Sequence, residues 1–262
     1  MSDGGMIVEF ENVMKKFENG VHALDGLTMS VPPGSVFGFI GLNGAGKTTT
    51  IRLLAGLSRK DSGEIRLFGK EIERHNYSYK RDIGFVLDEP LYFDWLSARE
   101  YLEFVGTMYD LQPHDIRTRV AELLDFFELL DKEDSTIGSF STGMKKKVSL
   151  AAAIIHNPRL VILDEPLEGI DAVAASSIKE ALSMMASKGA TVFISSHVLD
   201  TIERFCTEIA IIHNGKILLQ CHTEDIRSRI KDSLTKSTFE SLEELFVELV
   251  SDKMRRKHLS WL

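Results

Sequence analysis

Apolar and polar residues alternate along the first part of the chain, in short runs that are closed by turn residues. Residues 7–12 follow this alternation, which predicts a strand with one buried face. A turn over 15–20 carries Phe17, and Pro32, Pro33 and Gly34 close a second strand. Strands are predicted over 23–31, 35–40, 64–68 and 83–87. The opening of the chain is therefore rich in β-structure.

The spacing of apolar residues becomes helical between residue 97 and about residue 157. One helix face carries Leu102, Val105 and Tyr109, and a second carries Ile116, Val120, Leu123, Leu124, Phe127 and Leu130. About sixty residues with little strand signal predict a helical subdomain, over about 89–157, inserted into an α/β core.

Short apolar strands return after residue 157. The segment 160–163 is wholly apolar, as expected for a strand buried in a parallel sheet. A helix is predicted over 172–187, strands over 191–195 and 208–212, and a hairpin at Asn214-Gly215 leads into 216–219. Residues 223–262 are predicted to be a charged helical extension. Its apolar residues Leu242, Leu245, Phe246 and Leu249 favour a packed amphipathic helix over a partner-binding one.

Composition excludes several classes of protein. The formal net charge of −8 argues against a general nucleic-acid binder. Cys206 and Cys221 fit neither a metal spacing nor a disulfide framework, which favours a reducing cytoplasm. No apolar run approaches the ~18 residues of a membrane span. A membrane role would need a separate membrane polypeptide.

The segment that follows the strand 35–40 has the G-x-x-x-x-G-K-[ST] pattern of a P-loop. Its glycines let backbone N–H groups point at phosphate oxygens, and the helix that follows adds partial positive charge. Lys47 is expected to reach the β- and γ-phosphates, and the Thr48 hydroxyl to bind Mg²⁺. The predicted nucleotide-binding loop comprises Gly41, Leu42, Asn43, Gly44, Ala45, Gly46, Lys47, Thr48 and Thr49.

Further candidates stand at the ends of later strands or at a helix start. Asp164 and Glu165 follow the strand 160–163, at the edge of an α/β sheet where ligands bind. Asp164 fits a second Mg²⁺ position, and Glu165 can act as general base toward water. His197 can donate a hydrogen bond to a γ-phosphate. Ser141 is a good N-cap for the helix that begins after it, whose N-terminus attracts anions.

In this order and spacing, the motifs resemble those of the ATP-binding subunits of ABC transporters, over about residues 7–222. The variant Ser141-Thr-Gly-Met-Lys145 is similar to the signature of subunits that serve ABC-2 type exporters of drugs, bacitracin and sodium. The resemblance implies one ABC ATPase domain over 1–222, with a P-loop NTPase core, an antiparallel β subdomain and the helical insertion.

The resemblance also implies a mechanism. Two copies of the subunit dimerise head to tail around two ATP molecules, so that Lys47 of one copy and Ser141 and Gly143 of the other hold the same γ-phosphate. Phe17 is implied to stack on adenine, and 169–171 to cross to the partner copy. ATP hydrolysis then drives a separate membrane permease, and the subunit is peripheral at the cytoplasmic face.

Three departures from the family pattern stand out. Asp88 occupies the position of a glutamine that links Mg²⁺ and water to the membrane partner, and is a candidate metal ligand. Thr142 and Met144 replace glycine and glutamine in the signature, and Leu167-Glu168 replace a small polar pair. Turnover rate and subunit cooperation are left open by these changes.

Two other functions compete with that of a transporter subunit. A soluble ABC-type ATPase of translation or DNA repair would carry two cassettes or a long coiled coil, and this sequence has one copy of each motif and no coiled coil. A regulatory module that binds ATP with slow turnover is disfavoured by intact Lys47, Asp164, Glu165 and His197, although Asp88 keeps it open.

Overall fold

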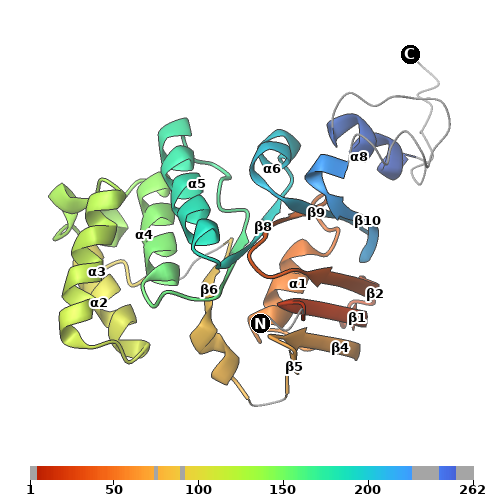
Figure 1. Cartoon of the computed structure of the whole chain (residues 1–262), viewed down its shortest axis with the longest axis horizontal. Helices are drawn as coiled ribbons and strands as arrows, with labels where there is room; N and C mark the ends of the chain where they lie inside the picture. Colours follow the sequence, from red (N-terminus) through yellow and green to blue (C-terminus); the bar gives the residue numbers. More distant parts are fainter. Residues whose placement is uncertain (1–4, 74–75, 89–91, 226–241, 252–262) are drawn as a thin grey trace.

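A computed structural model of the chain describes residues 5–73, 76–88, 92–225 and 242–251. Within them, two β-sheets lie beside a group of helices (Figure 1). The smaller sheet has the strand order β2-β1-β4-β5 and is antiparallel. Its strands are β1 (Val8–Lys16), β2 (His22–Val31), β4 (Ser62–Leu67) and β5 (Lys70–Glu71).

The larger sheet has the strand order β10-β9-β3-β8-β7-β6. Strands β9, β3, β8, β7 and β6 run parallel, and β10 is antiparallel to β9. The bounds of these strands are β3 (Val36–Ile40), β6 (Ile83–Val86), β7 (Leu160–Asp164), β8 (Thr191–Ser196), β9 (Glu208–His213) and β10 (Lys216–His222). The central strand β3 therefore pairs with two strands that come more than 150 residues later in the chain.

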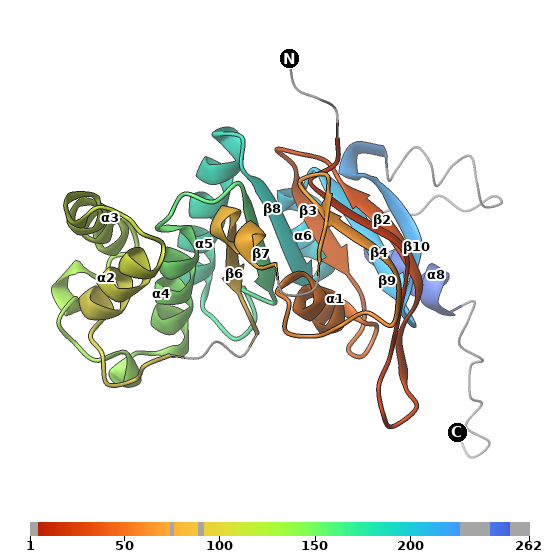
Figure 2. The ribbon, with the colours of Figure 1, turned by 90° about the horizontal axis from the view of Figure 1, so that it is seen from below.

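Alternating residues of the larger sheet fill two separate apolar clusters. Phe37, Phe39 and Phe193 point to one side, where the antiparallel sheet and α1 (Lys47–Leu54) cover them. Val36 and Ile194 point to the other side, toward the helices. Those helices include α4 (Thr142–Ile154), α5 (Ala172–Ser187) and α6 (Leu199–Phe205), and Figure 2 shows α1 between the two sheets.

The predicted helical segment forms a group of helices at one end of the molecule, at the left of Figure 1. It contains α2 (Ala98–Met108), α3 (Pro113–Phe126) and α4. Ser97 caps α2 through a capping box with Glu100, in which each residue's side chain bonds the other's backbone N–H. Four short 3₁₀ helices complete the described structure: η1 (Ser78–Asp82), η2 (Leu130–Lys132), η3 (Ile137–Ser139) and η4 (Thr223–Asp225).

The predicted fold class, an α/β core with an antiparallel sheet and added helices, is confirmed. In α8 (Leu242–Ser251) the side chains of Leu245 and Phe246 are buried in the apolar cluster on the helix-covered side of the larger sheet. The prediction of a packed amphipathic helix is therefore also confirmed. The domain boundaries at 222 and at about 89–157 stay predictions, and residues 89–91 and most of 226–262 lie outside the described residues.

Two differences from the sequence prediction have simple causes. Helix α1 begins at Lys47 rather than at residue 50, because the last residues of the P-loop already form its first turn. Gly46, with a φ of 117°, is its N-cap. Helix α6 was not predicted, since it is seven residues long and too short for a clear period.

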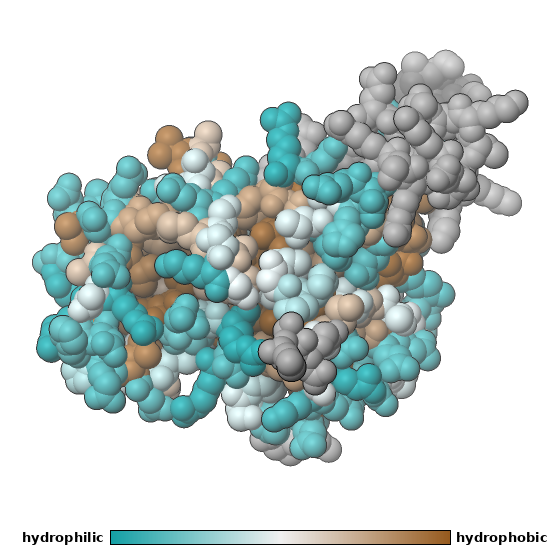
Figure 3. Space-filling view, in the orientation of Figure 1, coloured by the Kyte–Doolittle hydropathy of each residue, from teal (hydrophilic) through white to brown (hydrophobic). Residues whose placement is uncertain are grey.

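The longest helix among the described residues, α5, has 16 residues. No helix there is long and apolar enough to cross a bilayer. The face shown in Figure 3 is covered largely by hydrophilic side chains, with apolar ones scattered among them.

Candidate active site

The ends of three neighbouring parallel strands bring the main candidates together. The P-loop follows β3, Glu165 follows β7 and His197 follows β8. The register aligns these ends, because Ile40 lies opposite Ser196, and Asp164 lies opposite Ser195. Lys47, Asp164, Glu165, Ser195 and His197 are called the strand-end cluster below.

The P-loop glycines are required by close backbone approach. A Cβ on Gly46, whose φ is 117°, would lie 2.7 Å from the carbonyl oxygen of Ala23. A Cβ on Gly41 would lie 2.6 Å from the carbonyl oxygen of Ile212. The loop therefore packs tightly against β2 and β9, and side chains at these two positions would displace it. The first turn of α1 then leaves backbone N–H groups available to an anion.

Lys47 is buried, with 6% of its side chain exposed. Its ammonium donates a hydrogen bond to the carbonyl oxygen of Gly41 at 2.8 Å, and it lies 3.2 Å from Oε1 of Glu165. That second contact is an ion pair without hydrogen-bond alignment, since Glu165 Oε1 is buried and accepts no hydrogen bond. A buried ammonium and carboxylate at this distance attract each other strongly, and removal of either one would leave the other buried without its partner.

Ser195 joins the two carboxylates that follow β7. Its hydroxyl donates to Oδ1 of Asp164 at 2.6 Å and accepts the backbone N–H of Glu165 at 3.0 Å. Burial raises the pKa of Asp164, and the hydrogen bond from the Ser195 hydroxyl, together with the neighbouring Thr48 hydroxyl, opposes that rise. The charges of Asp88 and Glu165 add to it. The cluster thus concentrates negative charge around Asp164.

The second carboxylate oxygen of Asp164 fits a divalent cation. Oδ2 is buried and has no hydrogen-bond partner, although the Thr48 side chain reaches this carboxylate. A buried carboxylate without a partner is costly, and a hard cation would offset that cost. Oxygen donors from a carboxylate and a hydroxyl are the donors that Mg²⁺ prefers. Asp88, exposed at the end of β6, contributes charge to the same region.

Glu165 occupies an unusual backbone conformation. Its φ is 48°, in the left-handed region that residues other than glycine rarely adopt. The carboxylate nevertheless faces inward, with Oε2 3.0 Å from Nδ1 of His197 and 3.3 Å from the His197 backbone N–H. Backbone strain of this kind is often retained at functional sites, where surrounding contacts hold it.

Three further predicted binding residues, Phe17, Ser141 and Gly143, belong neither to the P-loop nor to the strand-end cluster. Phe17 follows β1, 41% exposed, with Nζ of Lys15 over its ring at 5.6 Å. Ser141 caps α4 through the backbone N–H of Met144, and Gly143 packs against Ala174 at the start of α5. Both views place the α4 helix apart from α1 and its P-loop (Figures 1 and 2).

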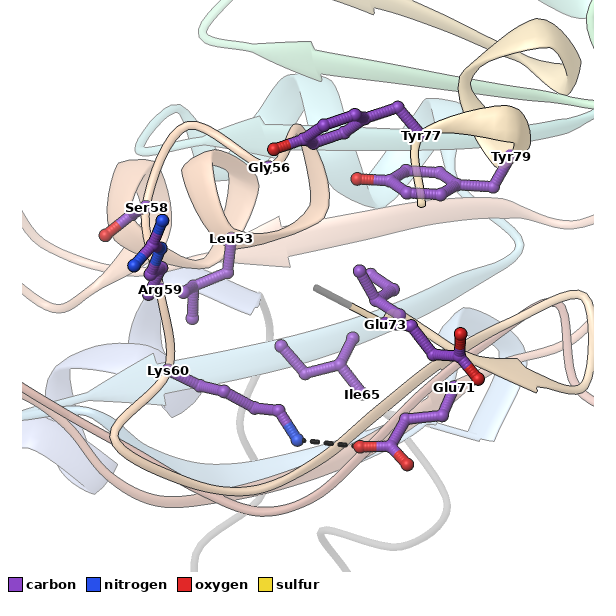
Figure 4. Close-up of a pocket in the computed structure, with 11 residues that line it drawn as sticks. Leu53, Gly56, Ser58, Arg59, Lys60, Ile65, Glu71, Glu73, Tyr77 and Tyr79 are labelled. Atoms are coloured by element: carbon purple, nitrogen blue, oxygen red, sulfur yellow. Dashed lines mark hydrogen bonds and ion pairs between the residues drawn. The ribbon is translucent and has the colours of Figure 1, made fainter. Parts of the chain in front are cut away.

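A separate cavity of about 390 Å³ lies at the other end of α1 (Figure 4). Leu53 and Gly56 from α1 and the turn after it, Ile65 from β4, and Tyr77 and Tyr79 line it. None of the predicted site residues is among its lining residues, so the candidate site is the strand-end cluster and not this cavity.

Two participants were missed from the sequence. Ser195 lies two residues before His197, but its bridging role depends on the register that places it opposite Asp164. Lys146 is the middle one of three consecutive lysines near the start of α4, and its ammonium donates to the carbonyl oxygens of Glu165 and Glu168. Only the placement of α4 reveals that contact.

Comparisons of the sequence and of the structure with known proteins all point to one family. The sequence model of the family described as ABC transporter matches residues 24–168. The linearmycin resistance ATP-binding protein LnrL of Bacillus subtilis (strain 168) is 34% identical over 242 residues, which cover 92% of this chain and 78% of that protein. The bacitracin transport ATP-binding protein BcrA of Bacillus licheniformis is 34% identical over 217 residues, 82% of this chain and 70% of that protein.

A solved structure agrees with these relatives. It is described as the structure of an ATP binding subunit of an ABC transporter, and it superposes with a TM-score of 0.84 at 32% sequence identity. The match covers 93% of this chain and 99% of the solved one.

Proposed function

The chain belongs to the ABC transporter family and is an ATP-hydrolysing ATP-binding subunit; on that premise we propose how its residues act and what it drives. The observation that carries the proposal is the meeting of Lys47, Glu165 and His197 at the ends of β3, β7 and β8. A phosphate-binding cation, a general base and a hydrogen-bond donor are the groups that ATP hydrolysis requires in one place.

ATP binds with its phosphates on the P-loop, formed by Gly41, Leu42, Asn43, Gly44, Ala45, Gly46, Lys47, Thr48 and Thr49. The Lys47 ammonium holds the β- and γ-phosphates, so the phosphate competes with Glu165 for the same cation. Glu165, freed from that ion pair, accepts a proton from the attacking water. His197 orients the Glu165 carboxylate and donates to the γ-phosphate.

Thr48, Asp164 and Asp88 are the proposed Mg²⁺ ligands. When bound, Mg²⁺ neutralises charge on the β- and γ-phosphate oxygens. Asp164 is preset for this role by Ser195, which fixes one of its oxygens at 2.6 Å and leaves the other without a hydrogen bond. Asp88 provides a carboxylate that tunes the charge near the γ-phosphate.

A second copy of the chain completes each site. Ser141 and Gly143 stand at the N-terminus of α4, apart from the P-loop of the same copy, and the N-terminus of this thirteen-residue helix attracts anions. We place them against the γ-phosphate bound by the partner copy in a head-to-tail dimer. Phe17 is exposed just beyond the end of β1 and offers its ring to adenine.

The dimer drives a separate transmembrane permease that exports its substrate, and the subunit lies at the cytoplasmic face of the membrane. The names of the relatives, which refer to linearmycin resistance and bacitracin transport, favour export. The alternatives are a soluble ABC-type ATPase and a regulatory module with slow turnover. Binding of this chain to a permease would distinguish the transporter subunit from both. Neither nucleic acid nor direct membrane contact is part of the proposal.

Substitution of Glu165 by glutamine tests the composite site. The Glu165→Gln variant should retain ATP and form a dimer in size-exclusion chromatography with Mg-ATP, because the base is lost while the phosphate contacts remain. Wild type should hydrolyse ATP in a steady-state assay, and Ser141→Ala combined with Glu165→Gln should weaken the dimer. A monomer at saturating ATP would contradict the head-to-tail arrangement.

Co-purification of the wild-type chain with the product of a neighbouring membrane-protein gene tests whether the chain binds a permease.

A further inference from the structure

Three consecutive lysines near the start of α4 have three different sets of contacts. Nζ of Lys145 lies 3.3 Å from a carboxylate oxygen of Asp94, in the helical part. Nζ of Lys147 donates to the carbonyl oxygen of Phe127 at 3.0 Å, also in the helical part. Lys146 alone among the three reaches the segment that follows β7. The run is therefore not a solvated charged face, as such runs usually are.

Lys146 makes two short hydrogen bonds to backbone carbonyls of that segment. Its ammonium donates to the carbonyl oxygen of Glu165 at 2.8 Å and to that of Glu168 at 2.6 Å. Charge-assisted hydrogen bonds from a partly buried donor are stronger than ordinary ones. Burial lowers the pKa of Lys146, while the charges of Asp88, Glu168 and Glu165 raise it. The ammonium thus lies among the carboxylates of the site.

The carbonyl that Lys146 holds belongs to the residue with the strained backbone. Glu165 has a φ of 48°, and its N–H donates to the hydroxyl of Ser195 at 3.0 Å. Its peptide groups are therefore fixed on both sides, by Ser195 before the Cα, and after it by Lys146 at 2.8 Å with the Glu168 backbone N–H at 3.2 Å. A residue in the left-handed region returns to negative φ unless its surroundings hold it. A change in φ would carry the carboxylate away from Lys47 and His197.

We propose that Lys146 is a positioning residue for Glu165, and that it links the N-terminal part of α4 to the catalytic carboxylate of the same copy. The inference rests on the proposed function of Glu165 and of Ser141. Lys146 lies five residues after Ser141 on one helix, so a shift of α4 when Ser141 meets the partner's nucleotide is transmitted to the backbone of Glu165. Lys146 thus joins the composite site to the chain's own general base.

Substitution of Lys146 by methionine keeps the length of the side chain and removes its donors. We expect kcat for ATP to fall about tenfold or more, because small displacements of a catalytic group have large effects on rate. The ATP dissociation constant should change by less than about twofold, since the P-loop contacts remain. Lys146→Arg keeps the donors and should recover most of kcat. Lys147→Met, on the same helix but outside the signature, with its hydrogen bond to the Phe127 carbonyl in the helical part, is the matched control and should stay near wild type.

A double-variant cycle separates positioning from general destabilisation. In single-turnover hydrolysis, Lys146→Met added to Glu165→Gln should cause little further loss, because Lys146 acts through a carboxylate that is already gone. Equal losses in both backgrounds would overturn the inference, as would wild-type kcat in Lys146→Met. If Lys146→Met does not fold, Lys146→Gln, which keeps a shorter neutral donor, replaces it in the same cycle. Absence of ATPase activity in wild type would contradict the proposed function instead, before any Lys146 variant is compared.

Discussion

Nζ of Lys47 lies 3.2 Å from Oε1 of Glu165, and both side chains are buried. The proposed phosphate-binding cation and the proposed general base thus form one ion pair. Phosphate binding must separate them, so the affinity for ATP and the activation of the base are linked through this contact.

Replacement of Lys47 by alanine should weaken ATP binding by about 10- to 100-fold, the range expected for losing a charge-assisted hydrogen bond. Isothermal titration with ATP measures it. The variant also leaves Glu165 buried without its cation, so thermal unfolding must be followed in parallel. Unchanged nucleotide affinity in a folded variant would refute the assignment of Lys47.

The ion pair makes a prediction that the motif alone does not make. Glu165→Gln should bind ATP more tightly than wild type, by several-fold or about 1 kcal/mol, because Lys47 no longer has to leave a carboxylate. The comparison is made by titration with ATP in the absence of Mg²⁺, where turnover does not interfere. Weaker binding than wild type would show that Glu165 does not compete with the phosphate.

His197 should contribute to turnover more than to binding. His197→Ala removes the contact with Oε2 of Glu165 at 3.0 Å, and we expect kcat to fall by about 100-fold, the lower end of general acid–base effects. The control is His222→Ala, which removes a histidine of β10 that is paired with Glu208 of β9. A similar loss in both variants would count against a specific role for His197.

Asp88→Gln should alter turnover with little change in ATP affinity. Removal of one negative charge near Asp164 should ease the approach of a hydroxide-like nucleophile, and kcat should rise by a modest factor at saturating Mg²⁺. Loss of a hard ligand should raise the Mg²⁺ concentration needed for half-maximal rate. If the Mg²⁺ curves of wild type and variant superimpose, Asp88 is structural. Its alternative role as a cap for the turn at Glu89-Pro90 lies outside the described residues.

His156 should make the folded state sensitive to acid. Its ring stacks on Tyr109 with centroids 3.6 Å apart, and burial lowers its pKa from 6.5 to about 4, against an opposing contact with the Ile83 backbone. The unfolded chain therefore binds a proton more tightly than the folded one between these values. Stability contributed by neutral His156 is present above about pH 6.5 and is lost as the pH falls toward 4.

A phenylalanine at position 156 would keep the stacking and remove the titration. Wild type should lose about 1–3 kcal/mol more than His156→Phe between pH 7 and pH 4, a range reduced for partial solvent exposure of the ring. Urea unfolding of both proteins at the two pH values measures the difference. Parallel pH dependence would show that His156 is not the responsible group.

The sequence predicts those parts of the site that depend on one strand and the residue after it. Lys47, Glu165 and His197 each follow a recognisable apolar strand, and parallel strands place their carboxyl ends at one edge. The bridge from Ser195 to Asp164 depends on a register between residues thirty-one positions apart, which no local pattern encodes. The reach of Lys146 and the positive φ of Glu165 depend on how α4 packs, and are visible only in three dimensions.

The strand order of the larger sheet also has a consequence for how the protein is made. Strand β3 carries the P-loop at its end, and its two neighbours, β8 and β9, occupy residues 191–196 and 208–213. The ribosome synthesises the P-loop long before it synthesises β8 and β9, the strands that flank β3 in the sheet. Nascent chains that stop before β9 lack the strand against which Gly41 packs, and we expect them to need protection from aggregation until synthesis passes residue 213.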